Sequence, residues 1–100
     1  MTRRTTTTTR QTYLVEHYRS GHNGAELRDQ AERVRDAVVD MTRSGKAIRY
    51  LSSTIVPGDD YFQSVLEAAS KRLVREAHSR AGISIERISV AVPIGDVEGR

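Results

Sequence analysis

Two histidines, His17 and His22, lie five positions apart where a strand-like run passes into a loop. Imidazole is the commonest transition-metal ligand at neutral pH, so the pair is a candidate metal site. Glu16 is the nearest carboxylate, but adjacent residues of a regular strand point to opposite faces. A further ligand would therefore have to come from another part of the chain or from a second subunit. The alternative is that both are ordinary histidines, at the surface or partly buried.

Glu16 offers a different chemistry, because it lies in the middle of TYLVEHYR (12–19), a run rich in aromatic and β-branched residues. If this run forms a central strand, Glu16 points either at covering helices or into a cavity on the other face. Burying a carboxylate is costly without a partner, so Glu16 is a candidate general base or ligand anchor. The alternative is a salt bridge to Arg49 or to another arginine across the sheet.

Hydroxyl-bearing residues of the later runs could join Glu16 in a polar pocket. Strict alternation within AIRYLSSTIV (47–56) places Tyr50, Ser52 and Thr54 on one face. Hydroxyls beside one carboxylate resemble a small polar ligand pocket, although they equally resemble ordinary strand residues. The predicted ligand-binding residues are Glu16, Tyr18, Tyr50, Ser52 and Thr54, with Ser64 and Glu67 as further candidates to line the same cavity.

The elements that position these residues follow from the hydrophobic pattern. Strands are predicted at 12–19, 47–56, 61–68 and 88–94, and helices at 24–43 and 70–80. The first helix carries its apolar residues at spacings of 4, 3, 4 and 3, which defines one helical face. These residues are Leu27, Ala31, Val34, Val38 and Met41.

Capping residues mark the ends of both helices. Asn23 is a predicted N-cap, with Glu26 at the capping-box position, and Gly45 can adopt the positive φ that ends the helix. Ser70 is a predicted cap of the second helix, and Gly82 is its predicted stop. The second helix places His78 next to the apolar Ala77, so His78 is expected at the edge of the apolar face.

The element order, βαββαβ, predicts a ferredoxin-like α+β fold. The right-handed crossover rule then gives a four-stranded antiparallel sheet in the order 4-1-3-2, with both helices on one face. The other face of the sheet is left uncovered, and it is not cleanly polar. Such a face usually requires a second layer, so we predict a homodimer that packs sheet against sheet around a barrel-like cavity.

Charge is concentrated at the N-terminus. The chain has 16 Lys and Arg against 13 Asp and Glu, a net charge of +3. Three arginines lie in the Thr-rich leader 1–11, which contains no acid and is expected to be disordered. The single predicted domain, 12–100, is therefore neutral by count. Phe62 is the only Phe and the K/R-G-F strand motif is missing, so nucleic acid is not an expected partner.

Several other classes are excluded by what the sequence lacks. No apolar run approaches the length of a membrane span or of a signal-peptide core, so we expect no membrane partner and a cytoplasmic location. The chain has no Cys, which excludes disulfides, thiolate ligands and a Cys nucleophile. No phosphate-binding loop or nucleophile elbow is present.

Four segments together resemble a known family. They are YLVEHY (13–18), IRYLSSTIVPGDD (48–60), VLEA (65–68) and VREAHSRAGISIERI (74–88). The chain is similar in them to small, mostly uncharacterised bacterial ferredoxin-like proteins, some described as nickel-binding, which resemble the dimeric α+β barrel group. The resemblance implies that fold and a possible nickel cofactor. The nickel-binding branch has a His near the position of Ser52 and a Cys near that of Ser64, and Ser is a poor ligand for such a metal.

Two functions from different classes are compatible with these observations. The first is a non-catalytic homodimer that binds a small molecule or a metal ion in or near the sheet-lined cavity. The alternative is a cofactor-free isomerase or oxygenase of the dimeric α+β barrel type, with Glu16 or His17 as the base. A third option, an assembly module, differs from both by having no pocket.

Overall fold

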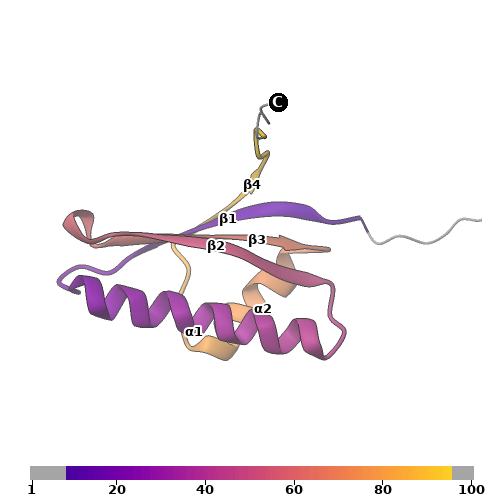
Figure 1. Cartoon of the computed structure of the whole chain (residues 1–100), viewed down its shortest axis with the longest axis horizontal. Coiled ribbons are helices and arrows are strands. Elements are labelled where there is room, and N and C mark those ends of the chain that lie inside the picture. The colour runs from indigo at the N-terminus through magenta and orange to yellow at the C-terminus, as the bar shows by residue number, and fades with distance from the viewer. Residues whose placement is uncertain (1–8, 96–100) are drawn as a thin grey trace, which may run out of the picture.

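The structure, a computed structural model, describes residues 9–95. The elements follow in the order β1 (Gln11–Tyr18), α1 (Gly24–Arg43), β2 (Ile48–Val56), the short 3-10 turn η1 (Pro57–Asp59), β3 (Tyr61–Ala68), α2 (Lys71–Ala81) and β4 (Arg87–Ala91). The strands form one antiparallel sheet in the order β2-β3-β1-β4. Both helices lie on the same face of the sheet (Figure 1). The predicted ferredoxin-like fold and its strand order are therefore confirmed.

Local sequence signals fix where α1 begins and ends. The Asn23 side chain accepts a hydrogen bond from the Glu26 backbone N–H, and the Glu26 side chain accepts one from the Asn23 N–H. This reciprocal capping box pairs two of the free N–H groups at the start of the helix. Gly45, just after the C-cap, has a φ of 89°, a conformation in which a side chain would be strained. Both predicted ends are confirmed.

The second helix is bounded in the same way. The Ser70 hydroxyl accepts a hydrogen bond from the Leu73 N–H, and Gly82 ends the helix with a φ of 73°. Its buried residues are Val74, Ala77 and His78. His78 is thus part of the buried face of α2, and the prediction that it lies at the edge is wrong.

The strand boundaries differ slightly from those predicted. β1 begins at Gln11, the last residue of the predicted leader, and most of that leader (1–8) lies outside the described residues. β4 ends at Ala91, three residues before the predicted Ile94. The reason is the length of its neighbour, because Ala91 pairs with Thr12 and β1 extends only one residue further. The alternation of apolar residues continues past Ala91, but β1 does not extend far enough to pair with them.

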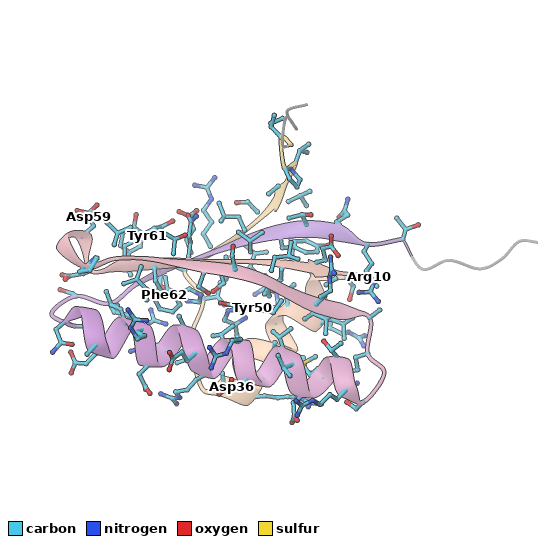
Figure 2. The ribbon with its side chains drawn as sticks, in the orientation of Figure 1. Arg10, Asp36, Tyr50, Asp59, Tyr61 and Phe62 are labelled. Carbon is cyan, nitrogen blue, oxygen red and sulfur yellow. The ribbon has the colours of Figure 1, made fainter. Side chains whose placement is uncertain are left out.

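The hydrophobic core fills the space between the sheet and the two helices. The buried face of α1 consists of the five apolar residues predicted for it, from Leu27 to Met41. Val15 of β1 and Leu66 of β3 are fully buried beneath the helices. Figure 2 shows Phe62 and Tyr50 on the helix side of the sheet and Tyr61 on the opposite side.

The opposite face of the sheet, which we call the open face, is not covered by any element of residues 9–95 (Figure 1). The pairing registers place side chains of all four strands on this face in rows that cross the sheet. Its residues are Thr12, Leu14, Glu16 and Tyr18 of β1; Tyr61, Gln63, Val65 and Glu67 of β3; Arg49, Ser52, Thr54 and Val56 of β2; and Arg87, Ser89 and Ala91 of β4.

The capping box makes a direct prediction for stability. Replacing Asn23 with Ala should lower the free energy of unfolding by about 1 kcal/mol, because a helix N–H loses its side-chain acceptor. Urea titration followed by circular dichroism measures the change. Arg28→Ala, at an exposed position of the same helix, is the matched control and should stay within about 0.5 kcal/mol of the native chain. Equal effects of the two substitutions would contradict the assigned role of Asn23.

Candidate functional site on the open face of the sheet

Glu16 lies in the centre of the open face, because β1 is an inner strand and alternation turns Glu16 away from the helices. Val15 and His17, its neighbours in sequence, are both buried on the helix side. The Glu16 side chain is 21% exposed. Its Oε1 accepts a hydrogen bond of 2.9 Å from the Tyr61 hydroxyl on the adjacent strand β3. The carboxylate is therefore held in place without being enclosed.

Tyr61 links Glu16 to Gln63, whose Oε1 lies 2.9 Å from the same hydroxyl. A hydroxyl has one proton, which it can donate to only one of these two acceptors. Rotating the Gln63 amide by half a turn would present its NH₂ group instead, so that Gln63 donates to Tyr61 while Tyr61 donates to Glu16. Burial, together with the hydrogen bond to Glu16, raises the pKa of Tyr61 to about 12. The phenol thus remains protonated at neutral pH and acts as a donor.

Of the two salt bridges considered for Glu16 from the sequence, to Arg49 or to another arginine across the sheet, the structure has the second. Arg49 pairs with Glu67, with Nη2 at 3.2 Å from Oε1, and so the suggested Glu16–Arg49 bridge does not form. Arg87 of β4 lies opposite Glu16 instead, with Nε at 3.9 Å from Oε2. This contact is long, and the Arg87 side chain is 73% exposed. Such a pair is worth at most about 1 kcal/mol.

An aromatic pair borders the carboxylate. Tyr18 stands opposite Tyr61 in the β1–β3 register, and their ring centroids are 4.9 Å apart with an interplanar angle of 52°. Tyr18 is 57% exposed. Sequence analysis included Tyr18 and allowed for an unnamed arginine across the sheet, the role that Arg87 has, but it missed Tyr61 and Gln63. The antiparallel register of 12–19 against 61–68 would have revealed Tyr61 and Gln63, but a register is not determined until the turn and the bulges are known.

A β-bulge in β2 separates two residues that strict alternation placed together. The register skips Leu51, so that Tyr50 pairs with Leu66 and Ser52 with Val65, which are adjacent on β3. Tyr50 therefore faces the helices, whereas Ser52 and Thr54 remain on the open face. The extra residue of a bulge reverses the facing of every later side chain. The prediction that Tyr50 shares a pocket with Ser52 and Thr54 is wrong.

On the helix side, Tyr50 belongs to a buried chain of hydroxyls. Its OH donates to Ser53 Oγ, which lies 2.7 Å from Ser64 Oγ. Ser64 is completely buried, so it cannot line a cavity on the open face. These hydrogen bonds satisfy polar groups beneath the sheet and have a structural role.

Ser52 and Thr54 lie further from Glu16 than a compact pocket requires. Thr54 shares a row with Gln63 and Glu16, and it is separated from Glu16 by the whole of β3. Two strand spacings amount to about 10 Å between backbones. Within one chain, the structure thus brings together Glu16, Tyr18 and Tyr61, while Ser52 and Thr54 lie near the rim formed by β2.

The two histidines predicted as metal ligands lie in different environments. His17 points at the helices and is completely buried, whereas His22 is partly exposed in the loop before α1. Among residues 9–95, no group of three or more His, Cys, Asp or Glu side chains is arranged to hold a metal ion. His17 and Glu16 also lie on opposite faces of the sheet. The two residues considered as general bases therefore cannot act together on one ligand.

His17 is part of a stacked pair with His78. Its ring lies 4.2 Å from the Phe62 ring and 5.0 Å from the His78 ring, centroid to centroid, and both contacts are stacked. His17 Nδ1 lies 3.0 Å from the Ser84 carbonyl and His78 Nδ1 lies 2.8 Å from the Val74 carbonyl. Both Nδ1 atoms must carry the proton to donate these bonds, which leaves each buried Nε2 a bare acceptor without a partner.

Burial keeps both rings neutral. It lowers the pKa of His17 from 6.5 to about 4, with a smaller contribution from His78. Burial likewise lowers the pKa of His78. Arg19 adds to both effects, since its guanidinium donates to the Ser84 carbonyl at 2.6 Å and to Glu86 Oε1 at 2.9 Å beside the pair. The Glu86 carboxylate and the Ser84 hydrogen bond oppose the shift of His17 only in part.

Two shallow grooves lie on the helical side, away from the open face. One runs between α1 and α2 and includes Arg33, Asp40 and Arg80. The other lies at the start of α1 and includes His22 and Glu26. Both are wide open to solvent and lined by charged side chains of mixed sign. Neither contains Glu16, and His22 is the only residue of the predicted site in either groove.

The arrangement as a whole defines a βαββαβ α+β protein with a polar and aromatic cluster on the uncovered face of its sheet. Among solved structures, the chain is similar to that of SCO4226 from Streptomyces coelicolor A3(2), with a TM-score of 0.63 and 18% sequence identity. The match covers 85% of this chain and 99% of that one. At this identity the likeness shows the fold alone. No protein-family profile and no curated protein sequence matches the chain.

No helix in the described part of the chain combines the length and the apolar character needed to cross a membrane.

The buried histidine pair predicts a pH dependence of stability. Because the folded-state pKa of His17 lies below that of the unfolded chain, the unfolded chain binds more protons as the pH falls below about 6.5. The contribution of the neutral His17 ring to the free energy of unfolding should be complete above pH 6.5. It should decline toward pH 4, by up to about 3 kcal/mol for a pKa shift from 6.5 to about 4. Urea titrations at pH 7.5 and 4.5 measure the loss.

Comparison of variants assigns this loss to a residue. His17→Gln should be less stable than the native chain at pH 7.5 but should lose less between the two pH values, with the contribution of His78 remaining. His22→Gln is the matched control, since His22 is partly exposed in a loop, and it should keep the native pH dependence. The same loss in His17→Gln as in the native chain would show that the buried ring does not cause it.

Proposed function

We propose that the protein is a homodimer whose two open faces pack against each other and enclose a small-molecule site around Glu16. The observation that carries this proposal is the open face itself, whose centre combines apolar side chains with a carboxylate. A sheet face with apolar side chains at its centre is normally covered by a second layer. A second copy of the chain supplies a cover of matching shape, and symmetric dimers are the commonest oligomers.

The centre of the open face is suited to burial. Leu14 and Val65 pair with each other across β1 and β3, and both are only partly buried in the single chain. Four strands about 4.8 Å apart, with residues about 3.3 Å apart, present a face of about 500 Å² in projection. Two such faces approach the lower limit of about 1,200 Å² for a stable interface. Additional contacts outside the sheet would raise the buried area above this limit.

The residues after β4 can provide these contacts. Val92 is 79% exposed and Ile94 is 90% exposed. Figure 1 shows β4 and the segment that follows it rising away from the helices, on the side of the open face. An apolar extension in this direction would lie against a second copy placed on that face. We call residues 92–95 the C-terminal arm.

The ligand site follows from the position of Glu16. Enclosing a carboxylate between two sheets is costly unless a partner compensates its charge, and the long contact to Arg87 does so only weakly. A bound small molecule can provide this compensation. Ser52 and Thr54 would line the rim of the same cavity, as the sequence predicted, while Tyr50 is replaced by Tyr61 as the aromatic residue beside the carboxylate.

A metal ion is the other ligand that the sequence suggested, and nickel the metal implied by resemblance. Of the two predicted ligands, only His22 is accessible, because His17 lies beneath the helices with its Nδ1 engaged. Titration of the protein with nickel, zinc and copper, followed by calorimetry, tests this version directly. If the protein releases heat on binding one of these metals and His22→Gln does not, a metal site at His22 is supported.

The dimer proposal predicts the effect of a charge on the open face. Val65→Lys should convert the protein from a dimer to a monomer, since the ammonium group would have to be buried between two sheets. Sedimentation equilibrium at several protein concentrations measures the mass. Ser79→Lys is the control, because it adds the same charge at an exposed position of α2 and should remain dimeric. If the native protein is itself monomeric at about 100 μM, its dissociation constant is weaker than that of a stable dimer, and the dimer proposal is wrong.

The C-terminal arm predicts a weaker effect. A chain ending at Ala91 should still fold, because the paired part of β4 is intact. Its dimer should dissociate at least about tenfold more readily, since burial of Val92 and Ile94 contributes more than about 1.4 kcal/mol. Replacing both residues with Ser in the full chain should have the same effect. An unchanged dissociation constant in both variants would remove the arm from the interface.

A further inference from the structure

The described strands carry two carboxylates on the open face, and arginine partners compensate their negative charges to different degrees. Glu67 is paired with Arg49 at 3.2 Å. Glu16 has only the long contact of 3.9 Å to Arg87, and its closest partner is the neutral hydroxyl of Tyr61. The negative charge of Glu16, at the centre of the open face, is therefore largely uncompensated by a nearby cation.

Two aromatic residues lie near this charge on the open face: Tyr61, which contacts Glu16 through its hydroxyl, and Tyr18, two residues further along β1. The Tyr61 hydroxyl occupies Oε1 of Glu16, whereas Oε2 has only the long contact of 3.9 Å to Arg87. The Tyr18 and Tyr61 rings are 4.9 Å apart and tilted against each other by 52°, so their planes meet at an angle, and we call this part of the open face the corner. A cation within about 6 Å of such a ring is attracted to its face, and the attraction increases when water is excluded.

A carboxylate and two tilted aromatic rings have the chemistry that recognises one class of ligand. We propose that Glu16, Tyr18 and Tyr61 form a binding site for an organic ammonium group. The carboxylate supplies the opposite charge, and the two rings supply a surface for alkyl groups on nitrogen. This inference rests on the proposed function, because it names the ligand class of the pocket that the open face would form.

Other ligand classes fit this corner less well. A bare metal ion needs several oxygen or nitrogen ligands, and no three His, Cys, Asp or Glu side chains of residues 9–95 are arranged to hold one. An anion would be repelled by Glu16. A purely apolar ligand would leave the carboxylate buried without compensation.

Arg87 is a built-in competitor for the ligand. Its guanidinium lies near Oε2 of Glu16 but is 73% exposed, so it can move into solvent when another cation binds. Removing Arg87 should therefore strengthen the binding of an ammonium ligand. A residue that merely stabilised the fold at this position would have no such effect.

The experiment compares two ligands of the same shape. Choline and 3,3-dimethylbutan-1-ol differ in that the quaternary nitrogen of the first is a carbon in the second. Isothermal titration calorimetry with the full chain measures both. Choline should bind at least about tenfold more tightly, as expected for a cation enclosed by rings and a carboxylate. Equal affinity for the two compounds would overturn the proposal.

Variants identify the residues responsible. Glu16→Gln should weaken choline binding about tenfold and abolish the preference over the neutral compound. Tyr18→Leu should weaken choline binding by a factor of about three or more. Glu32→Gln is the matched control, since it removes a carboxylate from α1, away from the open face, and should leave choline binding unchanged. Arg87→Ala should increase the affinity.

Sedimentation of the same samples separates the two proposals. If the protein is a dimer but binds neither compound, the proposed dimer stands and the ammonium site is wrong. A monomer that binds choline in a Glu16-dependent way overturns the dimer and keeps the site. Choline binding that survives in Glu16→Gln places the ligand elsewhere and overturns the site. Each variant's circular dichroism spectrum must match that of the native chain, and Tyr18→Ile, which also removes the ring and suits a strand, replaces Tyr18→Leu if the latter is unfolded.

Discussion

The alternation of side chains along β1 is the constraint on which the rest of the structure depends. β1 is paired on both sides, so its register cannot slip by one residue without turning the whole strand over. Val15 and His17 must then enter the core, and Glu16 must face away from it. The core beneath the sheet and the charged cluster above it are thus two consequences of one pairing pattern.

This alternation also explains the opposite properties of two neighbouring titratable residues. His17 is enclosed by Phe62, His78 and the loop before β4, where burial holds its ring neutral. Glu16 is one residue away in sequence, yet it contacts the Tyr61 hydroxyl and remains partly in solvent. Arg19 holds the loop before β4 against the histidines, because its guanidinium donates hydrogen bonds to the Ser84 carbonyl and to Glu86. The Arg19 side chain is itself only 12% exposed.

Most of the fold could be predicted from the sequence, because its signals are local. The apolar spacing of α1, the capping pair Asn23 and Glu26, and Gly82 each determine an element boundary from a few neighbouring residues. The site could be predicted only in part. Glu16 and Tyr18 follow from alternation in one strand, but Tyr61 and Arg87 depend on how strands pair, and Tyr50 was misplaced because nothing local in the run IRYLSSTIV marks Leu51 as the bulged residue.

The bulge at Leu51 has a consequence for how copies of the protein can associate. β2 is an edge strand, and a regular edge offers a row of free N–H and C=O groups to which another strand can add without limit. The extra residue interrupts this row and twists the edge locally. Open-ended growth of the sheet is thereby discouraged, and association is directed to the face of the sheet, where a two-fold pair closes on itself and growth stops.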